Sequence, residues 1–352
     1  MNYEEALKEA GELDIKSMDM SHKRWLSVAK PLFSLGTLER AVTKMAGIFG
    51  SELFSIEKKA LVIMCADNGV VEEGVTQCGQ EITAAVTENF HKGMASSCIM
   101  AQIAGADVVP IDVGVAVDVD GVSVPERKIM YGTDNMTKAP AMSREQAIRA
   151  VEVGINIVGE LKEKGYGLLA TGEMGIGNTT TSSAVAAVLL DKDVRAVTGR
   201  GAGLSSEGLE KKIDAIERAI ALNKPDKNDA LDVLSKVGGL DIAAIAGMFI
   251  GGAAYRIPIM IDGFISAAAA LAAVRLCPNA HDFMIASHIS KEPAGRMVLE
   301  ALDLEHYIDC GMFLGEGTGA VAAMPLLDMA YAVYSKMSNF DEFGHESYKI
   351  LK

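Results

Sequence analysis

Short β-rich runs alternate with longer helical stretches from about residue 60 onward, and this alternation constrains the fold more than any other feature of the sequence. Strands are predicted at residues 60–65, 108–113, 168–170, 257–261 and 283–286, with a less regular one at 194–197. Helices are predicted at 146–162, 183–190, 207–222, 241–255, 265–274, 297–302 and 318–336. Strands that alternate with helices in this way form a parallel sheet covered on both faces. We therefore expect an α/β fold, preceded by helices within residues 1–50.

Composition and charge exclude several classes of protein. Of the 352 residues, 49% are hydrophobic and 23% are charged, which is typical of a globular protein. Asp and Glu outnumber Lys and Arg by 47 to 33, and this acidic balance argues against non-specific binding to nucleic acid or to an anionic membrane surface. The five cysteines include no closely spaced pair, which predicts reduced thiols in a cytoplasmic protein. The apolar run at 242–255 is too short for a membrane-spanning helix.

Polar or glycine-rich segments follow the predicted strands. They are residues 66–69, 112–114, 172–178, 262–263 and 287–290. In open α/β sheets, ligands bind outside the carboxyl ends of the strands. These segments therefore predict a binding rim along one edge of the sheet.

Two glycine-rich segments are candidates for an anion site. Residues 175–181 place Gly175, Gly177 and Asn178 before a run of threonines and an apolar helix, which favours either phosphate binding at a helix start or a tight turn capped by threonine. Residues 199–203 precede a second helix that carries Lys211 and Lys212. That segment either forms a second wall of the same anion site or is a flexible loop.

Carboxylates stand beside these segments. Glu316 lies within Gly-Glu-Gly-Thr-Gly and is either a general base or an acid that stabilises a helix start. Glu173 and Asp262 lie at strand ends, where each either binds a hydroxyl or orders a loop. No closely spaced histidine pair accompanies them, so no metal site is predicted, and the lone His288 is more often structural than catalytic.

Taken together and in order, these segments resemble the nicotinate-nucleotide–dimethylbenzimidazole phosphoribosyltransferases of cobamide (vitamin B12-type) biosynthesis. The resemblance runs from about Ala29 to about Leu327. It rests on residues 30–39, 66–75, 80–83, 112–114, 172–181, 199–201, 262–265, 287–288 and 314–320. It implies a doubly wound, mostly parallel, Rossmann-like sheet and a dimer, either of identical chains or with a related subunit. Residues 51–290 would form the nucleotide- and base-binding domain, and residues 1–50 plus 291–352 a small helical domain.

The resemblance also implies a reaction. Ribose phosphate passes from nicotinate mononucleotide to a lower-ligand base, giving an α-riboside phosphate and nicotinate. The pyridinium leaving group departs neutral while the incoming base loses a proton, so one general base suffices. No metal or other cofactor is implied. A nicotinamide-dependent dehydrogenase is disfavoured because the first turn lacks GxGxxG, and the remaining alternative is a non-catalytic or partner-dependent paralogue subunit that binds nucleotide.

Individual residues acquire roles from the same resemblance. Glu316 matches the catalytic glutamate of the family, and Glu173 matches a second carboxylate of the active site. The implied substrate-binding residues are Thr76, Gln80, Met174, Gly175, Gly177, Asn178, Gly201, Gly203, Lys212, Asp262, Ser287, Leu314 and Gly315. Among them Met174, Thr76 and Gln80 belong to the base side, and Lys212 is the charge partner of the phosphate.

Four positions depart from what many relatives carry. Leu32-Phe33 stands in place of Pro-Gly, Cys78-Gly79 in place of Tyr-Pro, Ala294-Gly295 in place of Gly-His, and Asp241 in place of glutamate. The change at Cys78-Gly79 removes an aromatic side chain beside the implied base site. We therefore hypothesise that the chain accepts a base other than dimethylbenzimidazole, such as another benzimidazole or a simple phenol.

Overall fold

The fold is built around one five-stranded parallel sheet in a computed structural model that describes residues 1–344, 346 and 348–350. The strand order is β2-β1-β3-β4-β5, and each pair of neighbours is parallel. The strands are β1 (Lys59–Ala66), β2 (Ala106–Gly114), β3 (Leu168–Met174), β4 (Ile259–Ile261) and β5 (Met284–Ala286). The predicted α/β class with a parallel sheet is confirmed. Because β1 lies between β2 and β3, the direction of winding changes beside β1.

Helices precede, connect and follow the strands. The α-helices are α1 (Tyr3–Glu9), α2 (Ile15–Ser27), α3 (Thr37–Phe49), α4 (Glu81–His91), α5 (Ser96–Ala104), α6 (Arg144–Glu163), α7 (Asn178–Leu190), α8 (Val194–Val197), α9 (Ser206–Asn223), α10 (Ala230–Val237), α11 (Leu240–Tyr255), α12 (Phe264–Leu276), α13 (Pro293–Ala301) and α14 (Thr318–Lys336). Short 3-10 helices are η1 (Gly69–Glu73), η2 (Pro278–Phe283) and η3 (Asp341–Phe343). No helix in the described part of the chain is long and apolar enough to cross a membrane.

The predicted strand at 194–197 is wrong, because these residues form the one-turn helix α8. The carboxylate of Asp193 accepts a hydrogen bond from the backbone N–H of Arg195 at 2.8 Å, which caps the helix start. The helix packs against α7, α9 and α13. Local capping and packing therefore override the β preference of the two valines.

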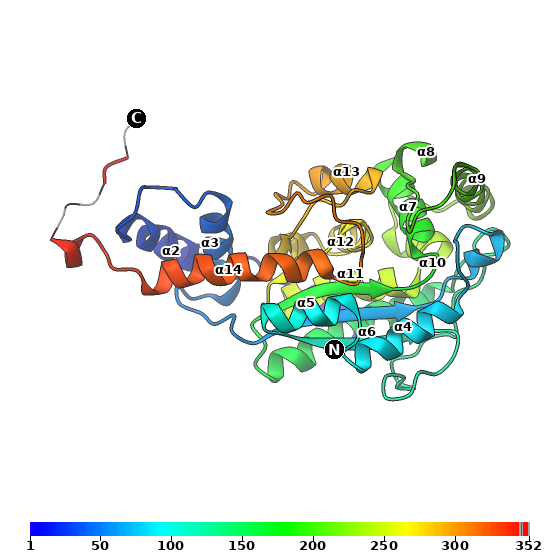
Figure 1. Ribbon diagram of the computed structural model, residues 1–352, viewed down its shortest axis with the longest axis horizontal. Helices are drawn as coiled ribbons and strands as arrows, with labels where there is room; N and C mark the ends of the chain where they lie inside the picture. Colours follow the sequence, from blue (N-terminus) through cyan, green and yellow to red (C-terminus); the bar gives the residue numbers. More distant parts are fainter. Residues whose placement is uncertain (345, 347, 351–352) are drawn as a thin grey trace.

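Side chains of the central strand β1 point alternately into two separate cores. Val62 and Met64 pack with residues of α6, α11 and α12, whereas Ile63 and Cys65 pack with residues of α3, α5 and α14. Figure 1 shows α4 and α5 on one side of the sheet and α7 and α12 on the other. Burial on both faces explains why β1 is a continuous apolar run rather than an alternating one.

Two helices on one face approach each other closely because glycines line their contact. A Cβ atom at Gly154 of α6 would lie 1.9 Å from the carbonyl oxygen of Ala244, and one at Gly247 of α11 would lie 1.9 Å from that of Val151. A side chain at either position would force the helices apart. Their contact keeps α11 in place against β1, β2 and β3.

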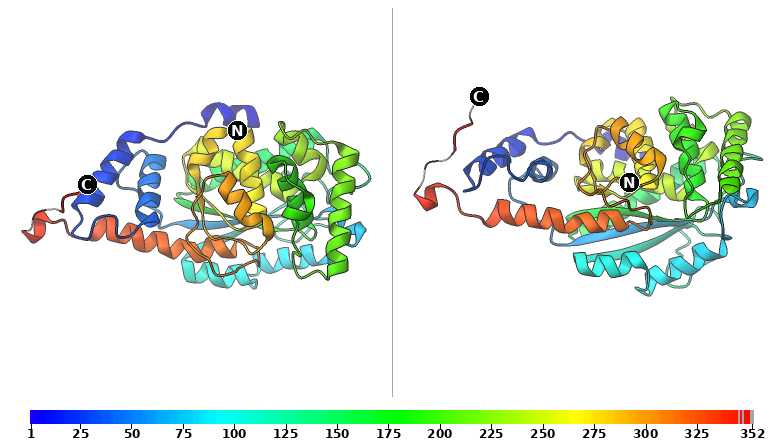
Figure 2. Two further views of the ribbon diagram at one scale, coloured as in Figure 1. Left: turned by 90° about the horizontal axis from the view of Figure 1, so that it is seen from above. Right: turned by 45° about the horizontal axis from the view of Figure 1, so that its top comes forward.

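The ends of the chain are helical but do not all pack in one place. Helices α2 and α3 pack against each other and α3 packs against α14 (Figures 1 and 2), while Lys44 of α3 donates to the carbonyl of Met284 in β5 at 2.8 Å. Helix α1 instead packs against α6 and α11, and α13 packs against α7 and α12. The division into residues 51–290 and 1–50 plus 291–352 stays a prediction.

Candidate active site

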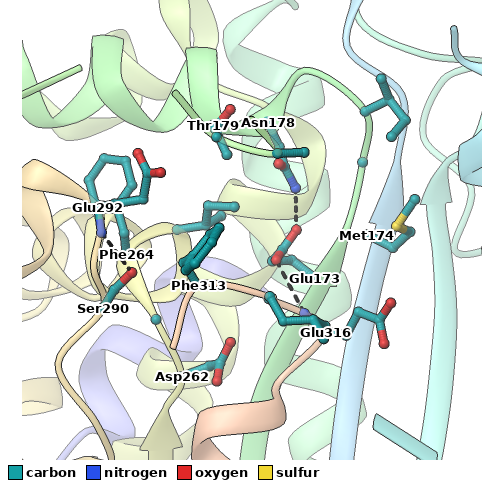
Figure 3. A pocket seen from close by; sticks show the side chains of 18 of the residues that line it. Glu173, Met174, Asn178, Thr179, Asp262, Phe264, Ser290, Glu292, Phe313 and Glu316 are labelled. Atoms are coloured by element: carbon teal, nitrogen blue, oxygen red, sulfur yellow. Dashed lines mark hydrogen bonds between the residues drawn. The ribbon is translucent and has the colours of Figure 1, made fainter. Parts of the chain in front are cut away.

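The carboxyl ends of the parallel strands meet at one edge of the sheet, and a cavity of about 170 Å³ lies there (Figure 3). Residues from the segments after β3, β4 and β5 line it, together with residues from the turn before α14. Of the predicted residues, the cavity is lined by Glu173, Met174, Gly175, Asn178, Gly201, Asp262, Leu314, Gly315 and Glu316. The structure thus brings both predicted carboxylates to one site.

Other predicted residues lie outside this lining. The hydroxyl of Thr76 donates to the carbonyl of Cys78 at 2.7 Å, and the side-chain amide of Gln80 donates to the carbonyl of Asn68 at 3.2 Å. The carbonyl of Gly203 accepts a hydrogen bond from Gln77. These contacts order the chain between β1 and α4.

Three further predicted residues support the cavity from behind. Gly177 has φ +92° and is the N-cap of α7, where a Cβ atom would lie 2.9 Å from the side chain of Val71. Ser287 is buried, and its hydroxyl donates to the carbonyl of Ile261 at 2.6 Å. Lys212 is also buried. Gly177 and Ser287 therefore shape the backbone around the cavity rather than line it.

One end of the cavity has the properties of an anion site. The turn that begins α7 is pressed against the end of β1, since a Cβ atom at Gly175 would lie 2.2 Å from the carbonyl oxygen of Ala66. Gly201 lies opposite, where a Cβ atom would be 2.8 Å from Thr179 Oγ1. The positive end of the α7 dipole and accessible backbone at glycines favour a phosphate here.

Lys212, not Lys211, is directed toward this end. Its Nζ donates to the hydroxyl of Thr179 at 2.8 Å and to the carbonyl of Gly199 at 3.1 Å. Burial lowers the pKa of Lys212 to about 8, and the negative charge of Glu292 acts in the opposite sense. Lys211 is exposed and pairs with Glu207 at 3.0 Å along α9.

Glu173 is buried among other acids. Burial raises its pKa well above the usual range, the charge of Asp241 raises it further, and a hydrogen bond from Asn178 opposes both. The Asn178 amide nitrogen donates to Glu173 and also to Asp241 at 3.1 Å. Burial raises the pKa of Asp241 to about 7. Both carboxyl oxygens of Glu173 thus accept hydrogen bonds, Oε2 from the amide of Asn178 and Oε1 from the backbone N–H of Glu316.

Glu316 stands between two glycines and beside Glu173. It has φ +58°, and its backbone N–H donates to Glu173 Oε1 at 3.4 Å (Figure 3). Its carboxylate accepts a hydrogen bond at 3.3 Å from the backbone N–H of Ser97 at the start of α5. A Cβ atom at Gly315 would lie 2.5 Å from Glu173 Oε1, so glycine is required for the two glutamates to meet.

Asp262 orders the loop that carries Glu316. Its carboxylate accepts hydrogen bonds from the backbone N–H groups of Gly319 at 2.7 Å, Ala320 at 3.1 Å and Gly317 at 3.2 Å. Burial raises the pKa of Asp262, although His288 opposes this. Of its two predicted roles, loop ordering is the one seen in the structure.

Several lining residues were missed in the sequence. They are Ile176, Thr179, Ala202, Gly263, Phe264, Ile265, Ser290, Glu292 and Phe313, together with His288, for which the sequence predicts a structural role. The polar run after β5 continues to Glu292, and this continuation was an available signal. Asp241 was noted only as a departure, although it follows two glycines at a helix start. Within the described residues, no group of three or more His, Cys, Asp or Glu side chains is arranged to hold a metal ion.

The comparison with known proteins decides the family. The phosphoribosyltransferase family model matches residues 11–344. The chain belongs to this family. It is 50% identical over 352 residues to the nicotinate-nucleotide–dimethylbenzimidazole phosphoribosyltransferase of Ruminiclostridium cellulolyticum, with all of both chains covered. It is 52% identical over 345 residues to the enzyme of that name from Acetivibrio thermocellus, with 98% of each chain covered.

A solved structure agrees with the family assignment. The crystal structure of CobT from Thermus thermophilus superposes with a TM-score of 0.89 at 38% identity, covering 95% of this chain and 100% of the other. The resemblance and the doubly wound fold expected from the sequence are therefore confirmed. This chain is a phosphoribosyltransferase, and the cavity described above is its candidate active site.

Proposed function

We propose that this phosphoribosyltransferase moves ribose phosphate from nicotinate mononucleotide to the nitrogen of dimethylbenzimidazole or a related lower-ligand base. The observation that carries the proposal is one cavity with an anion site at one end and the paired glutamates Glu173 and Glu316 at the other. The names of relatives about 50% identical over their full length support the same substrates. The products are an α-riboside phosphate and nicotinate.

The two ends of the cavity suit the two parts of the reaction. The start of α7, with Lys212 behind it, would hold the phosphate of the nucleotide. Met174, Phe313 and Leu314 offer apolar surface to an aromatic base. Holding both reactants in line converts a bimolecular step into an effectively unimolecular one, which supplies much of the rate.

One of the two glutamates takes the proton, and the other positions it. The nicotinate leaving group departs neutral at its ring nitrogen and needs no acid, whereas the attacking base must lose a proton. Glu316 is the proposed general base, because the residue lines the cavity and its carboxylate is held by the backbone N–H of Ser97. Glu173 would hold the backbone of Glu316 in place through its Oε1 atom rather than act as the base.

The Glu316→Gln variant tests the role of the base. We expect it to lose turnover by at least ~100-fold, because a positioned general base contributes about 10²–10⁴ in rate. Binding of nicotinate mononucleotide, measured by calorimetry, should stay within about twofold, because the amide keeps the side chain's size and hydrogen bond to Ser97. A near-normal rate would refute the assignment. If the purified wild-type chain also shows no turnover, the alternative of a non-catalytic or partner-dependent paralogue is favoured.

The identity of the base is tested with a panel. Purified protein is incubated with nicotinate mononucleotide and dimethylbenzimidazole, benzimidazole, a methoxybenzimidazole, phenol or p-cresol, and nicotinate release is measured. Clear preference for dimethylbenzimidazole would contradict the hypothesis built on Cys78-Gly79. Preference for a phenol would support it, and Glu316 would then remove the proton of a hydroxyl.

The proposal includes assembly and location. We propose a dimer, of identical chains or with a related subunit, in the cytoplasm. Cys65, Cys78, Cys98, Cys277 and Cys310 are all unbridged, in keeping with a reducing compartment. Size measurement of the purified chain alone distinguishes a homodimer from a chain that needs a different partner.

A further inference from the structure

Lys212 carries a buried charge without a direct ion pair. Within the described part of the chain its hydrogen bonds go to neutral acceptors, the hydroxyl of Thr179 and the carbonyl of Gly199. Buried charges are ordinarily compensated by a nearby opposite charge. The carboxylate whose charge acts on Lys212 is that of Glu292.

Glu292 is an incompletely satisfied acid inside the anion end of the cavity. It lines the cavity, and its backbone N–H donates to the hydroxyl of Ser290 at 3.3 Å (Figure 3). Its Oε2 atom is buried and has no hydrogen-bond partner among the described residues. Burial raises the pKa of Glu292, and the charge of Lys212 and the N–H of Gly201 oppose this.

The two opposite charges approach the same short loop. A Cβ atom at Gly199 would lie 1.9 Å from Glu292 Oε2, and one at Gly201 would lie 3.5 Å from Lys212 Nζ. The loop therefore leaves room for the Glu292 carboxylate only because residue 199 is glycine, and it passes within van der Waals distance of Lys212 at Gly201. A phosphate bound at the start of α7 would enter between these groups.

Other charged groups near Glu292 are directed elsewhere. The guanidinium of Arg200 donates to the carbonyl of Leu204 at 2.7 Å and to the hydroxyl of Ser206 at 3.0 Å. Lys291 Nζ lies 5.2 Å from the centre of the Phe313 ring. The remaining titratable groups of the cavity are Glu173, Asp262, His288 and Glu316. Lys212 is thus the charge that Glu292 balances.

We propose that the Glu292 carboxylate balances the charge of Lys212 in the absence of substrate. When the substrate phosphate binds, Glu292 takes a proton from solvent. The carboxylate becomes a carboxylic acid, which then donates a hydrogen bond to a phosphate oxygen. No other bond forms or breaks. A phosphate brings nearly two negative charges, and like charges at one site favour protonation of one of them. Phosphate binding is therefore coupled to proton uptake, and affinity falls as the pH rises. This inference rests on the proposed function, because it assumes a phosphate-bearing substrate.

Calorimetry with nicotinate mononucleotide at pH 7.0, in buffers of different ionisation enthalpy, measures the protons taken up. We expect the wild type to take up about 0.5 to 1 proton more than the Glu292→Gln variant. The glutamine amide can donate the same hydrogen bond without taking a proton from solvent. The dissociation constant of the variant for nicotinate mononucleotide should therefore rise less steeply above pH 7. The Glu300→Gln variant is the matched control, because Glu300 is an exposed acid on α13, and it should behave as the wild type.

Equal proton uptake by the wild type and Glu292→Gln would overturn the proposal, as would weaker binding by Glu292→Gln at every pH. If that variant does not fold, wild-type protein is titrated with sulfate, which does not itself titrate near pH 7. Uptake above about 0.5 proton then supports the proposal, because Lys212 with a pKa of about 8 contributes only about 0.1. No uptake overturns it. Failure of the wild type to bind the nucleotide while binding sulfate would count against the proposed function instead.

Discussion

Replacement of Lys212 by methionine is expected to stabilise the protein at neutral pH while it impairs substrate binding. Burial lowers the pKa of Lys212 from 10.5 to about 8, which corresponds to a cost of about 3 kcal/mol for holding the charge in the folded state. Methionine removes that cost but leaves Thr179 Oγ1 and the carbonyl of Gly199 without their donor, at about 1 kcal/mol each. The net gain in unfolding free energy is about 1 kcal/mol.

The sign of this effect depends on pH. The folded protein releases the proton of Lys212 at about pH 8 and the unfolded chain at about 10.5, so the cost is full below pH 8 and declines between these values. By pH 10 it falls below about 1 kcal/mol. The lost hydrogen bonds then dominate, and Lys212→Met becomes the less stable protein by about 1 kcal/mol.

Urea unfolding of wild type and variant at pH 7 and pH 10 measures the reversal, and steady-state kinetics measure the loss of binding. We expect KM for nicotinate mononucleotide to rise by at least ~10-fold, since a hydrogen bond to a charged group contributes about 1.5–3 kcal/mol. Lys211→Met is the matched control, because Lys211 is exposed and its pair with Glu207 is screened by solvent. A variant that is destabilised equally at both pH values, with unchanged KM, would refute the reasoning.

Two further substitutions test the site. Gly317→Ala should lower the unfolding free energy by about 2–4 kcal/mol, because residue 317 has φ +81° and the new Cβ would lie 2.2 Å from Leu61 Cδ1. Gly93→Ala, at φ +71° with open space around it, should lose only about 1 kcal/mol, and equal losses in urea unfolding would contradict the steric argument. Asp241→Asn should flatten the dependence of stability on pH between about 4 and 7. Because the pKa of Asp241 is raised, wild-type stability declines as the pH rises through about 7. Thermal unfolding of both proteins at pH 4, 5.5 and 7 measures this, and an equal slope in the variant would contradict the prediction.

The fold was predictable because its signals are local. The run at 60–65 is apolar on both faces, as a central parallel strand requires, and a polar or glycine-rich segment follows each strand at the edge where ligands bind. The strand predicted at 194–197 failed because Asp193 caps a helical turn there. The β preference of two valines is a weak signal beside a cap and three packed neighbours.

The site was predictable in part. Glu316 and Glu173 lie in glycine-rich segments that carry the family resemblance, and both line the cavity. Asp241 and Glu292 were missed because their importance comes from contacts across the fold. Asp241 accepts a hydrogen bond from Asn178, which lies 63 positions away in the sequence and also donates to Glu173. Glu292 interacts electrostatically with Lys212 on α9. No local pattern encodes such pairings.

Helix α14 runs from the turn that carries Glu316 to the N-terminal helices α2 and α3. It begins two residues after Glu316, and its other end is held by Arg24 of α2, which donates to the carbonyl of Tyr334 at 2.9 Å. At 1.5 Å per residue, its length is about 28 Å. One helix thus connects the turn that carries Glu316 to the N-terminal helices, so the packing of α2 and α3 against its far end helps to fix where that turn lies.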